Sequence, residues 1–457
     1  MAKSDSGGDG PTGFHAGGRA VASIVHRTFS LGLTMRSHRL KVVISGRRRA
    51  SRCQGIRAPR SSDGAGLANE SAVQEAKVGK QGFRIMDSDL HVLEPGDMYQ
   101  KYLEEPFRDR APVKTRPHVA ALEKWEVEGR VAPYWIDNQQ TMEANAPLQT
   151  EKEQTPLQAK AFERNFDAPT TLEAMDLEGV DVAILYRTIG GIIAQAMDSL
   201  EPEFSAALCR AYNNWLADYC REDAKRLKGA GLVSLQDIEA AVSEVGRMIS
   251  ELGFVGVSVH PDPAKGRFLY DPEVDPLWRE IEAQELAVGI HGTSTALAED
   301  DLTRKFLHHP AGRVVQRTLV FPWQLMSAMS GVLASGVIQR FPRLRIAFLE
   351  GNCGWLPWLM YRLDEQWEKH GAMILSKKPS EYFLSICYIS VDVDEELVGD
   401  VIRHYGDENI VLSTDYPHYD STFPEAINTF LGLDLPEESK RKILWDNCER
   451  FYGGHIS

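Results

Sequence analysis

The sequence predicts an α/β protein, a (β/α)8 TIM barrel with helical insertions after its first and fifth strands. Short apolar runs with the length of buried strands alternate with helical patterns eight times after Gly82. Such an alternation makes either a closed barrel or an open, doubly wound sheet. No Gly-x-Gly-x-x-Gly turn follows the first run, and polar residues end many of the runs instead of clustering at one switch point. We therefore expect a barrel domain over residues 81–457.

Residues 1–80 have a different composition and are expected to form a disordered basic extension. Residues 11–60 contain no Asp or Glu but many arginines among glycines and serines. Such a segment cannot bury enough apolar surface to offset the entropy of ordering. It could be an organelle transit peptide, a tail that contacts anionic surfaces, or sequence translated from a start codon that lies too early. We favour the last interpretation or simple disorder, because Met86 itself opens the first strand.

The expected elements follow one another regularly along the barrel domain. The Val- and Ile-rich runs suit strands that are buried on both faces. Asp237 is a helix N-cap, while Gly253 and Gly371 are helix stops. The predicted strands cover residues 83–91, 180–186, 227–235, 254–260, 286–291, 344–350, 383–393 and 410–415. The predicted helices cover residues 171–177, 204–219, 237–253, 275–285, 355–370, 395–404 and 437–451. Insertions are expected over about 95–168 and over 295–343.

Composition excludes several classes of function. The chain is 43% hydrophobic, as globular proteins are, and its net charge of -14 gives no basic surface for nucleic acid. No apolar stretch approaches the roughly 18 to 20 residues that span a bilayer. The six cysteines form no Cys-x-x-Cys pair and lie far apart, which argues against a disulfide framework or a zinc ribbon. We expect a cytoplasmic protein whose partner is a small-molecule substrate.

Residues that commonly bind metals stand at the ends of three distant strands. Strand alternation places Asp89 and His91 on one side of the first strand. His291 ends the fifth strand, and Asp415 ends the eighth, three residues before His418. Because the carboxyl ends of parallel barrel strands meet on one face, these side chains predict a single metal site.

Several motifs together resemble a known family. They lie at residues 86–95 (MDSDLHVLEP), 288–291 (VGIH), 341–344 (FPRL), 350–351 (EG), 354–357 (GWLP), 413–417 (STDYP) and 447–452 (NCERFY). In order and spacing, from about Gly82 to Gly454, the chain resembles the amidohydrolase-related family of metal-dependent barrels. The branch in question includes aminocarboxymuconate-semialdehyde decarboxylase and several aromatic-acid decarboxylases.

The resemblance implies which residues hold the metal. Carried over to this sequence, the family's ligands fall on Asp89, His91, His291 and Asp415, with Asp89 in place of the usual first histidine. From the residues alone, Asp87 or Glu94 could take the place of Asp89. We expect one divalent ion, Zn²⁺ or alternatively Mn²⁺, which a carboxylate in place of an imidazole makes more competitive. The resemblance also implies a homodimer, with the 295–343 insertion as a plausible contact surface.

Our leading prediction for the reaction is metal-dependent hydrolysis of a small carboxylated or aromatic molecule. A bound divalent ion lowers the pKa of a water molecule toward about 7, Asp415 accepts a proton, and Glu350 protonates the leaving group. Glu350 occupies the position of a catalytic histidine in the family's decarboxylases, which favours hydrolysis. The alternative is non-oxidative decarboxylation in the same site, with Glu350 or His418 as the acid. A barrel that binds a ligand without turnover is a third possibility.

Three further residues are candidates for binding the substrate. Arg187, just after the second strand, could bind a substrate carboxylate through two hydrogen bonds, or it could hold a neighbouring loop. His260, which ends the fourth strand, could line the site or be a packed, hydrogen-bonded histidine. Trp323 could line a pocket for a ring, or it could pack the second insertion onto the barrel.

Overall fold

The computed structural model describes residues 79–116, 124–132, 155–293, 312–371, 374–418 and 421–456. The predicted disordered extension lies outside these ranges except for Gly79 and Lys80, and so do residues 295–311 of the second predicted insertion.

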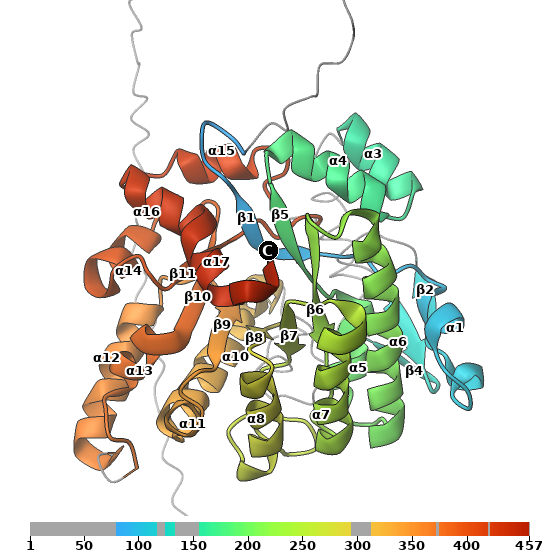
Figure 1. Cartoon of the computed structure of the whole chain (residues 1–457), viewed down its shortest axis with the longest axis horizontal. Coiled ribbons are helices and arrows are strands. Elements are labelled where there is room, and N and C mark those ends of the chain that lie inside the picture. The colour runs from blue at the N-terminus through green and yellow to red at the C-terminus, as the bar shows by residue number, and fades with distance from the viewer. Residues whose placement is uncertain are drawn as a thin grey trace, which may run out of the picture. The chain divides into compact units, whose positions relative to one another are not determined.

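Eight parallel strands form a nearly closed barrel that is surrounded by helices (Figure 1), which confirms the predicted TIM barrel. In the order in which they pair, the strands are β1 (Met86–His91), β5 (Val182–Tyr186), β6 (Leu227–Leu232), β7 (Gly256–Val259), β8 (Ala287–His291), β9 (Arg345–Leu349), β10 (Cys387–Asp392) and β11 (Ile410–Ser413). A separate antiparallel sheet consists of β2 (Val113–Arg116), β3 (Lys124–Val127) and β4 (Arg130–Ala132).

The helices connect successive strands and cover the outside of the barrel. They are α1 (Met98–Tyr102), α3 (Pro156–Glu163), α4 (Ala168–Glu178), α5 (Ile189–Ala196), α6 (Pro202–Cys220), α7 (Ile238–Arg247), α8 (Asp275–Ala283), α10 (Gly312–Ala334), α11 (Val337–Arg340), α12 (Leu356–Gln366), α13 (Pro379–Ile386), α14 (Val398–Tyr405), α15 (Ala426–Leu431), α16 (Glu437–Arg441) and α17 (Asn447–Tyr452). Within the described ranges, no helix combines the length and the apolar character needed to cross a bilayer.

Hydrogen bonds join β1, the first strand of the barrel, to the last strand β11 and to the segment that follows it. The Ser88 hydroxyl donates to the Leu412 carbonyl at 2.7 Å, and the His91 amide donates to the Tyr416 carbonyl at 2.8 Å. The two ends of the barrel domain therefore meet beside the strand ends that carry the candidate ligands.

A small apolar cluster fills the interior of the barrel. Its buried members come from the barrel strands or the residue next to them and from the helical residues 442–452. They are Met86, Ile184, Tyr186, Ala230, Val255, Ala287, Ala347, Leu349, Tyr388, Val411, Trp445, Cys448, Phe451 and Tyr452. The Tyr452 hydroxyl donates to the Ser88 carbonyl at 3.1 Å and lies 3.2 Å from the Tyr186 hydroxyl. Helix α17 is thus part of the barrel core (Figure 1).

The structure differs from the predicted elements at identifiable places. The apolar run from Phe383 to Ile386 is the end of helix α13, which begins at Pro379 with Glu381 capping it, so β10 starts only at Cys387. The first insertion contains the β2–β3–β4 sheet besides its helices. Helix α5, which was not predicted, follows β5 directly.

Candidate metal centre and active site

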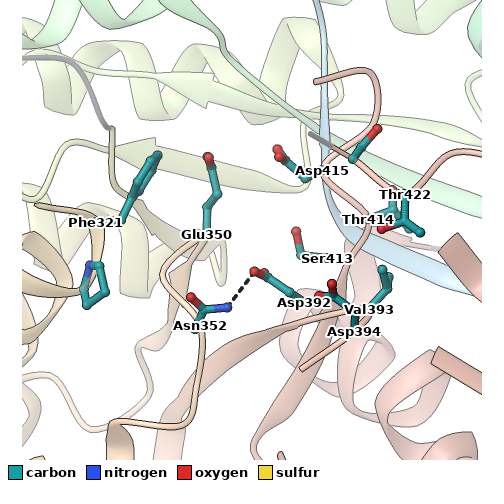
Figure 2. Close-up of a pocket in the computed structure, with 12 residues that line it drawn as sticks. Phe321, Glu350, Asn352, Asp392, Val393, Asp394, Ser413, Thr414, Asp415 and Thr422 are labelled. Atoms are coloured by element: carbon teal, nitrogen blue, oxygen red, sulfur yellow. Dashed lines mark hydrogen bonds between the residues drawn. The ribbon is translucent and has the colours of Figure 1, made fainter. Parts of the chain in front are cut away.

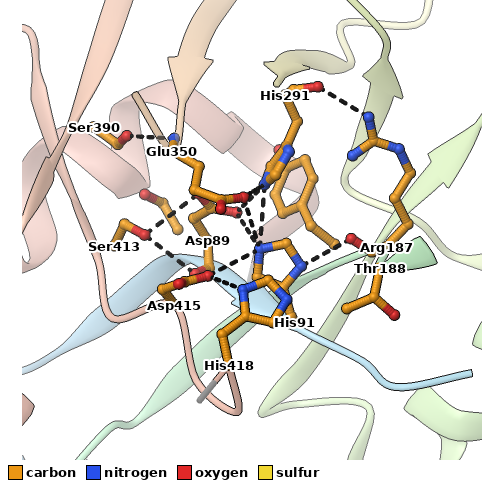
Figure 3. A network of polar contacts seen from close by, with 12 residues as sticks. Asp89, His91, Arg187, Thr188, His291, Glu350, Ser390, Ser413, Asp415 and His418 are labelled. Carbon is orange, nitrogen blue, oxygen red and sulfur yellow. Dashed lines mark hydrogen bonds and ion pairs between the residues drawn. The ribbon is translucent and has the colours of Figure 1, made fainter. Parts of the chain in front are cut away.

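Two overlapping groups of possible metal ligands lie at one end of the barrel (Figure 3). One group is Asp89, His91 and His291, and the other is His91, Glu350, Asp415 and His418. The Nε2 atoms of His91 and His291 lie 3.2 Å apart. His291 Nε2 is also 3.2 Å from Asp89 Oδ1 and 3.0 Å from Glu350 Oε2. His91 Nε2 lies 3.4 Å from Asp415 Oδ1. The structure therefore brings together all four predicted metal ligands and adds Glu350 to them.

Backbone carbonyls determine which nitrogen of each ring faces the cluster. His91 Nδ1 lies 2.8 Å from the Arg187 carbonyl, and His291 Nδ1 lies 2.8 Å from the Gly292 carbonyl. A carbonyl oxygen only accepts hydrogen bonds, so we assign the proton of each neutral ring to Nδ1. Each Nε2 then presents a lone pair to the other ring and to the carboxylates, as metal-ligating histidines do.

The electrostatics of the cluster require a positive charge at its centre. Burial alone would lower the pKa of His291, but the charges of Asp89 and Glu350 outweigh it and raise that pKa to about 10. Burial alone would raise the pKa of Glu350, but His291 and His91 hold it well below its ordinary value. Without a metal, a proton on His291 supplies the missing charge.

The donor set fits a divalent metal ion. Asp89 Oδ1 is buried and receives no aligned hydrogen bond, although it lies next to His291 Nε2. Two imidazole nitrogens and three carboxylates are ligands that zinc or manganese accepts, and the share of oxygen ligands favours the harder ion. These residues would hold one divalent ion.

Two of the acidic residues adopt left-handed backbone conformations. Glu350 has φ 58° directly after β9, and Asp415 has φ 57° two residues after β11. Such conformations are costly for residues other than glycine and occur often at functional sites. The Glu350 amide is held in this turn by a 3.0 Å hydrogen bond to the Ser390 hydroxyl. The backbone thus turns at the strand end, where each carboxylate reaches the cluster.

A glycine below His291 makes room for an aromatic ring. Gly289 lies two residues before His291 on β8, and a Cβ atom there would overlap the hydroxyl end of Tyr186. The Tyr186 ring stacks on His291, with ring centroids 5.5 Å apart. Gly289 therefore allows Tyr186 to support the imidazole from the barrel interior.

The other acidic residues of the first strand have different partners. Asp87 accepts hydrogen bonds from the Thr414 hydroxyl and amide, and burial raises its pKa to about 7. Glu94 accepts bonds from the amides of Thr188, Gly190 and Gly191 at the start of α5. Of the three candidates on this segment, only Asp89 lies at the cluster.

A polar cavity of about 180 Å³ opens beside the cluster (Figure 2). Its lining includes Glu350 and Asp415 and also Asp392, which the sequence analysis did not select. Burial and the nearby charges of Glu395 and Asp415 raise the pKa of Asp392 well above its ordinary value. Asp392 ends β10, so the same strand-end signal that identified Asp415 could have found it.

His418 pairs with Asp415 at the edge of the cluster. His418 Nδ1 and Asp415 Oδ1 are hydrogen-bonded, and the His418 ring stacks on His91 with centroids 4.1 Å apart. The His418 side chain is 20% exposed. The pair therefore connects the cluster with solvent.

Arg187 and His260 are buried behind the cluster. Arg187 Nη2 donates to the His291 carbonyl at 2.9 Å, whereas Nε and Nη1 have no hydrogen-bond partner among the described residues. His260 Nδ1 accepts from the Asp262 amide at 3.2 Å, which leaves a proton on Nε2, also without a partner there. Burial and then the charges of Arg187 and His291 hold the pKa of His260 well below its ordinary value.

Trp323 lies away from the cluster. It lines a second cavity, of about 690 Å³, and is not among the described residues that line the polar one. Its neighbour Phe321 lines the polar cavity instead.

The family of this chain can now be stated. A family model described as amidohydrolase matches residues 146–454, which is more than half of the chain. The chain belongs to the amidohydrolase family. It is therefore an enzyme of the amidohydrolase superfamily, and the resemblance inferred from its motifs is confirmed.

Curated relatives of this family member are decarboxylases. The 2-amino-3-carboxymuconate-6-semialdehyde decarboxylase of Dictyostelium discoideum is 25% identical over 303 residues, 63% of this chain and 77% of that protein. The gamma-resorcylate decarboxylase of Rhizobium sp. (strain MTP-10005) is 27% identical over 297 residues, 62% of this chain and 86% of that protein. These relatives favour decarboxylation over the hydrolysis that the sequence analysis preferred.

Solved structures share the fold. An amidohydrolase from Mycobacterium avium subsp. paratuberculosis has a TM-score of 0.65 and 21% identity, covering 81% of this chain and 100% of that one. A 5-carboxyvanillate decarboxylase from Novosphingobium aromaticivorans has a TM-score of 0.57 and 20% identity, covering 82% of this chain and 98% of that one. Its structure was solved with manganese and 4-hydroxy-3-methoxy-5-nitrobenzoic acid.

Proposed function

We propose that this enzyme is a divalent-metal-dependent decarboxylase that releases the carboxylate of a small aromatic acid as carbon dioxide. The observation that carries the proposal is the convergence of two imidazole nitrogens and three carboxylates next to the buried, unpaired donors of Arg187 and His260. Such a centre suits an anionic substrate held against a cation. The decarboxylase relatives support the reaction type.

The metal would be held by Asp89, His91, His291 and Asp415, with Glu350 within reach of the same ion. When bound, a divalent cation supplies positive charge that stabilises the electrons left on the substrate as the carbon–carbon bond breaks. We propose manganese rather than zinc. The carboxylate-rich donor set and the manganese in the related 5-carboxyvanillate decarboxylase support this choice.

Arg187 and His260, which line neither cavity in this structure, would bind the substrate's oxygen atoms once side chains at the cluster shift to admit the substrate. Arg187 Nε–H and Nη1–H and His260 Nε2–H are buried donors, and an unpaired buried donor is costly until it finds an acceptor. A carboxylate or a ring oxygen of the substrate would satisfy them. Arg187 also positions His291 through its bond to the His291 carbonyl.

Asp415 is the proposed proton donor. Loss of carbon dioxide leaves an electron pair on the ring carbon, which must take up one proton to complete the product. Asp415 lines the polar cavity, and His418, its hydrogen-bonded partner, reaches solvent and can return the proton. Glu350 is a poor donor, because its pKa lies well below the ordinary value.

The test is decarboxylation of aromatic acids in deuterated water by the manganese-loaded enzyme. Incubation with 2,6-dihydroxybenzoate and 5-carboxyvanillate should release carbon dioxide and place one deuterium on the carbon that carried the carboxylate, as read by NMR. Asp415→Asn should lower the rate by roughly 10² to 10⁴, the usual contribution of a general acid. Asp434→Asn, an exposed acidic residue outside the cavity lining, is the control. Cleavage of esters or amides without any decarboxylation would instead establish the hydrolase.

A further inference from the structure

A large second cavity adjoins the polar one. Its volume is about 690 Å³, and both cavities are lined by Pro322 and Asn352. The polar cavity, at about 180 Å³, is smaller than the roughly 300 to 1,000 Å³ that is usual for ligand pockets, whereas the second falls inside that range. The lining of the second cavity also includes Thr318, Leu319, Trp323, Trp355, Glu395 and Leu397.

The second cavity offers mainly apolar surface to a ligand. Trp323, Leu397 and Leu319 are 54%, 55% and 44% exposed, which is unusual for side chains of this size. Most of its polar groups already have partners within the protein. Glu395 accepts bonds from the Cys353 and Gly354 amides.

The other polar side chains of this cavity are also bonded internally. Asn352 Nδ2 donates to Asp392 Oδ2 at 2.6 Å, as Figure 2 shows. Trp355 Nε1 donates to the Gly351 carbonyl at 2.6 Å, and the Thr318 hydroxyl donates to the Val314 carbonyl at 2.7 Å. A ligand in this cavity would therefore gain most from hydrocarbon contacts.

One short segment of α10 separates the two cavities. Phe321 lines the polar cavity, Pro322 lines both, and Trp323 lines the apolar one. Pro322 lies inside the helix and cannot donate a backbone hydrogen bond. Because Pro322 and Asn352 line both cavities, the two cavities share a wall, which places the apolar cavity within reach of an arm attached to a molecule in the polar one.

We propose that the apolar cavity binds an uncharged hydrophobic arm of the substrate, a second aromatic ring or an alkyl chain attached to the aromatic acid. The inference rests on the proposed function, because it assigns the carboxylated end to the polar cavity. It extends that function by predicting a substrate larger than a single substituted ring.

The first experiment measures binding of 2-naphthol, an uncharged bicyclic probe, by calorimetry. Wild-type protein should bind 2-naphthol more tightly than phenol. Chelation of the metal should not change this preference, because none of the candidate metal ligands lines this cavity. Leu397→Glu should weaken 2-naphthol binding at least tenfold by placing a charge against the ring. Leu177→Glu, at a leucine of α4 that is 51% exposed and lies outside the lining, should bind as wild type does.

The second experiment compares substrates. The ratio of kcat/KM for a phenyl-substituted hydroxybenzoate to that for the unsubstituted acid should fall about tenfold in Leu397→Glu and stay constant in Leu177→Glu. Naphthol binding without any decarboxylation would refute the proposed reaction but would still support the apolar cavity as a binding site for hydrophobic groups. Equal naphthol affinity in wild type and Leu397→Glu would overturn the cavity assignment. So would light scattering that shows Leu397→Glu splitting a dimer, because a second copy would then cover this surface.

Discussion

The tautomers of His91 and His291 determine what the cluster can bind. Their Nδ1 atoms face backbone carbonyls, so both Nε2 atoms point at one another and at three carboxylates. Only a proton or a metal ion can occupy the space between them without strong repulsion. A proton and a metal ion therefore compete for the same position in the cluster.

This competition predicts that metal binding depends on pH. In the metal-free protein the pKa of His291 is raised to about 10, so a proton must leave before a metal binds. Manganese affinity should rise about tenfold per pH unit between pH 7 and 9, since one proton is displaced. Calorimetry in two buffers of different ionisation enthalpy should show the release of about one proton per ion. A pH-independent affinity would show that His291 is neutral before the metal binds.

Glu350 should contribute to metal affinity rather than act only as an acid. Its Oε2 atom is 3.0 Å from His291 Nε2, inside the cluster. Glu350→Gln should weaken manganese binding about tenfold or more, because one of three carboxylate charges is removed. Asp394→Asn, at a residue that lines the polar cavity but is not a candidate metal ligand, should change the affinity by less than about twofold. Titration calorimetry on both variants decides between these outcomes, and equal effects would mean that Glu350 acts only through long-range charge.

Strand β8 supports the metal centre because Gly289 leaves room for the Tyr186 ring, which stacks on His291. A side chain at Gly289 would overlap the Tyr186 hydroxyl below His291. Gly289→Ala should destabilise the fold by about 1 to 3 kcal/mol through overpacking and should lower the metal content of the purified protein. Thermal unfolding and elemental analysis measure the two effects.

A glycine elsewhere provides the matched control. A Cβ atom at Gly399, within helix α14, would meet no atom within 4 Å. Gly399→Ala should leave metal content unchanged and stabilise the helix by up to about 1 kcal/mol. If both glycine variants behaved alike, contact with Tyr186 would not be the reason for Gly289.

The strand ends explain how much of the centre could be predicted from the sequence. Parallel barrel strands end on one face, so a polar residue after an apolar run could be placed there from its position alone, as with Asp89, His291 and Asp415. The rule does not reveal which of several acidic residues on one strand points into the metal cluster. Asp87, on the same strand, bonds to Thr414 instead.

Contacts distant in sequence explain what the sequence did not reveal. Helix α5 begins at a glycine-containing segment, and the carboxylate that caps it belongs to Glu94, far upstream. The run from Phe383 to Ile386 suits a strand or a helix equally, and Pro379 with Glu381 decides for the helix. Periodicity also could not show whether Trp323 faces the metal cluster or the adjoining cavity.

For the molecule as a whole, self-association stays a prediction. The sequence predicts that the 295–343 insertion forms the contact surface of a homodimer, and its described part includes α10, where Val314 is exposed and lies outside both cavity linings. Static light scattering of the purified enzyme should give twice the mass of one chain. A single-chain mass at micromolar concentration would reject the homodimer.

The closure between β1 and β11 has a consequence for how the protein is made. Strand β1 leaves the ribosome well before its partner β11 and the core helix α17. Domains fold as units once their parts are present. Asp89 and His91 therefore lack Asp415 until β11 and the residues that follow it have been synthesised. The metal centre consequently forms only after all eight barrel strands are present, and a chain truncated before residue 410 has no complete site.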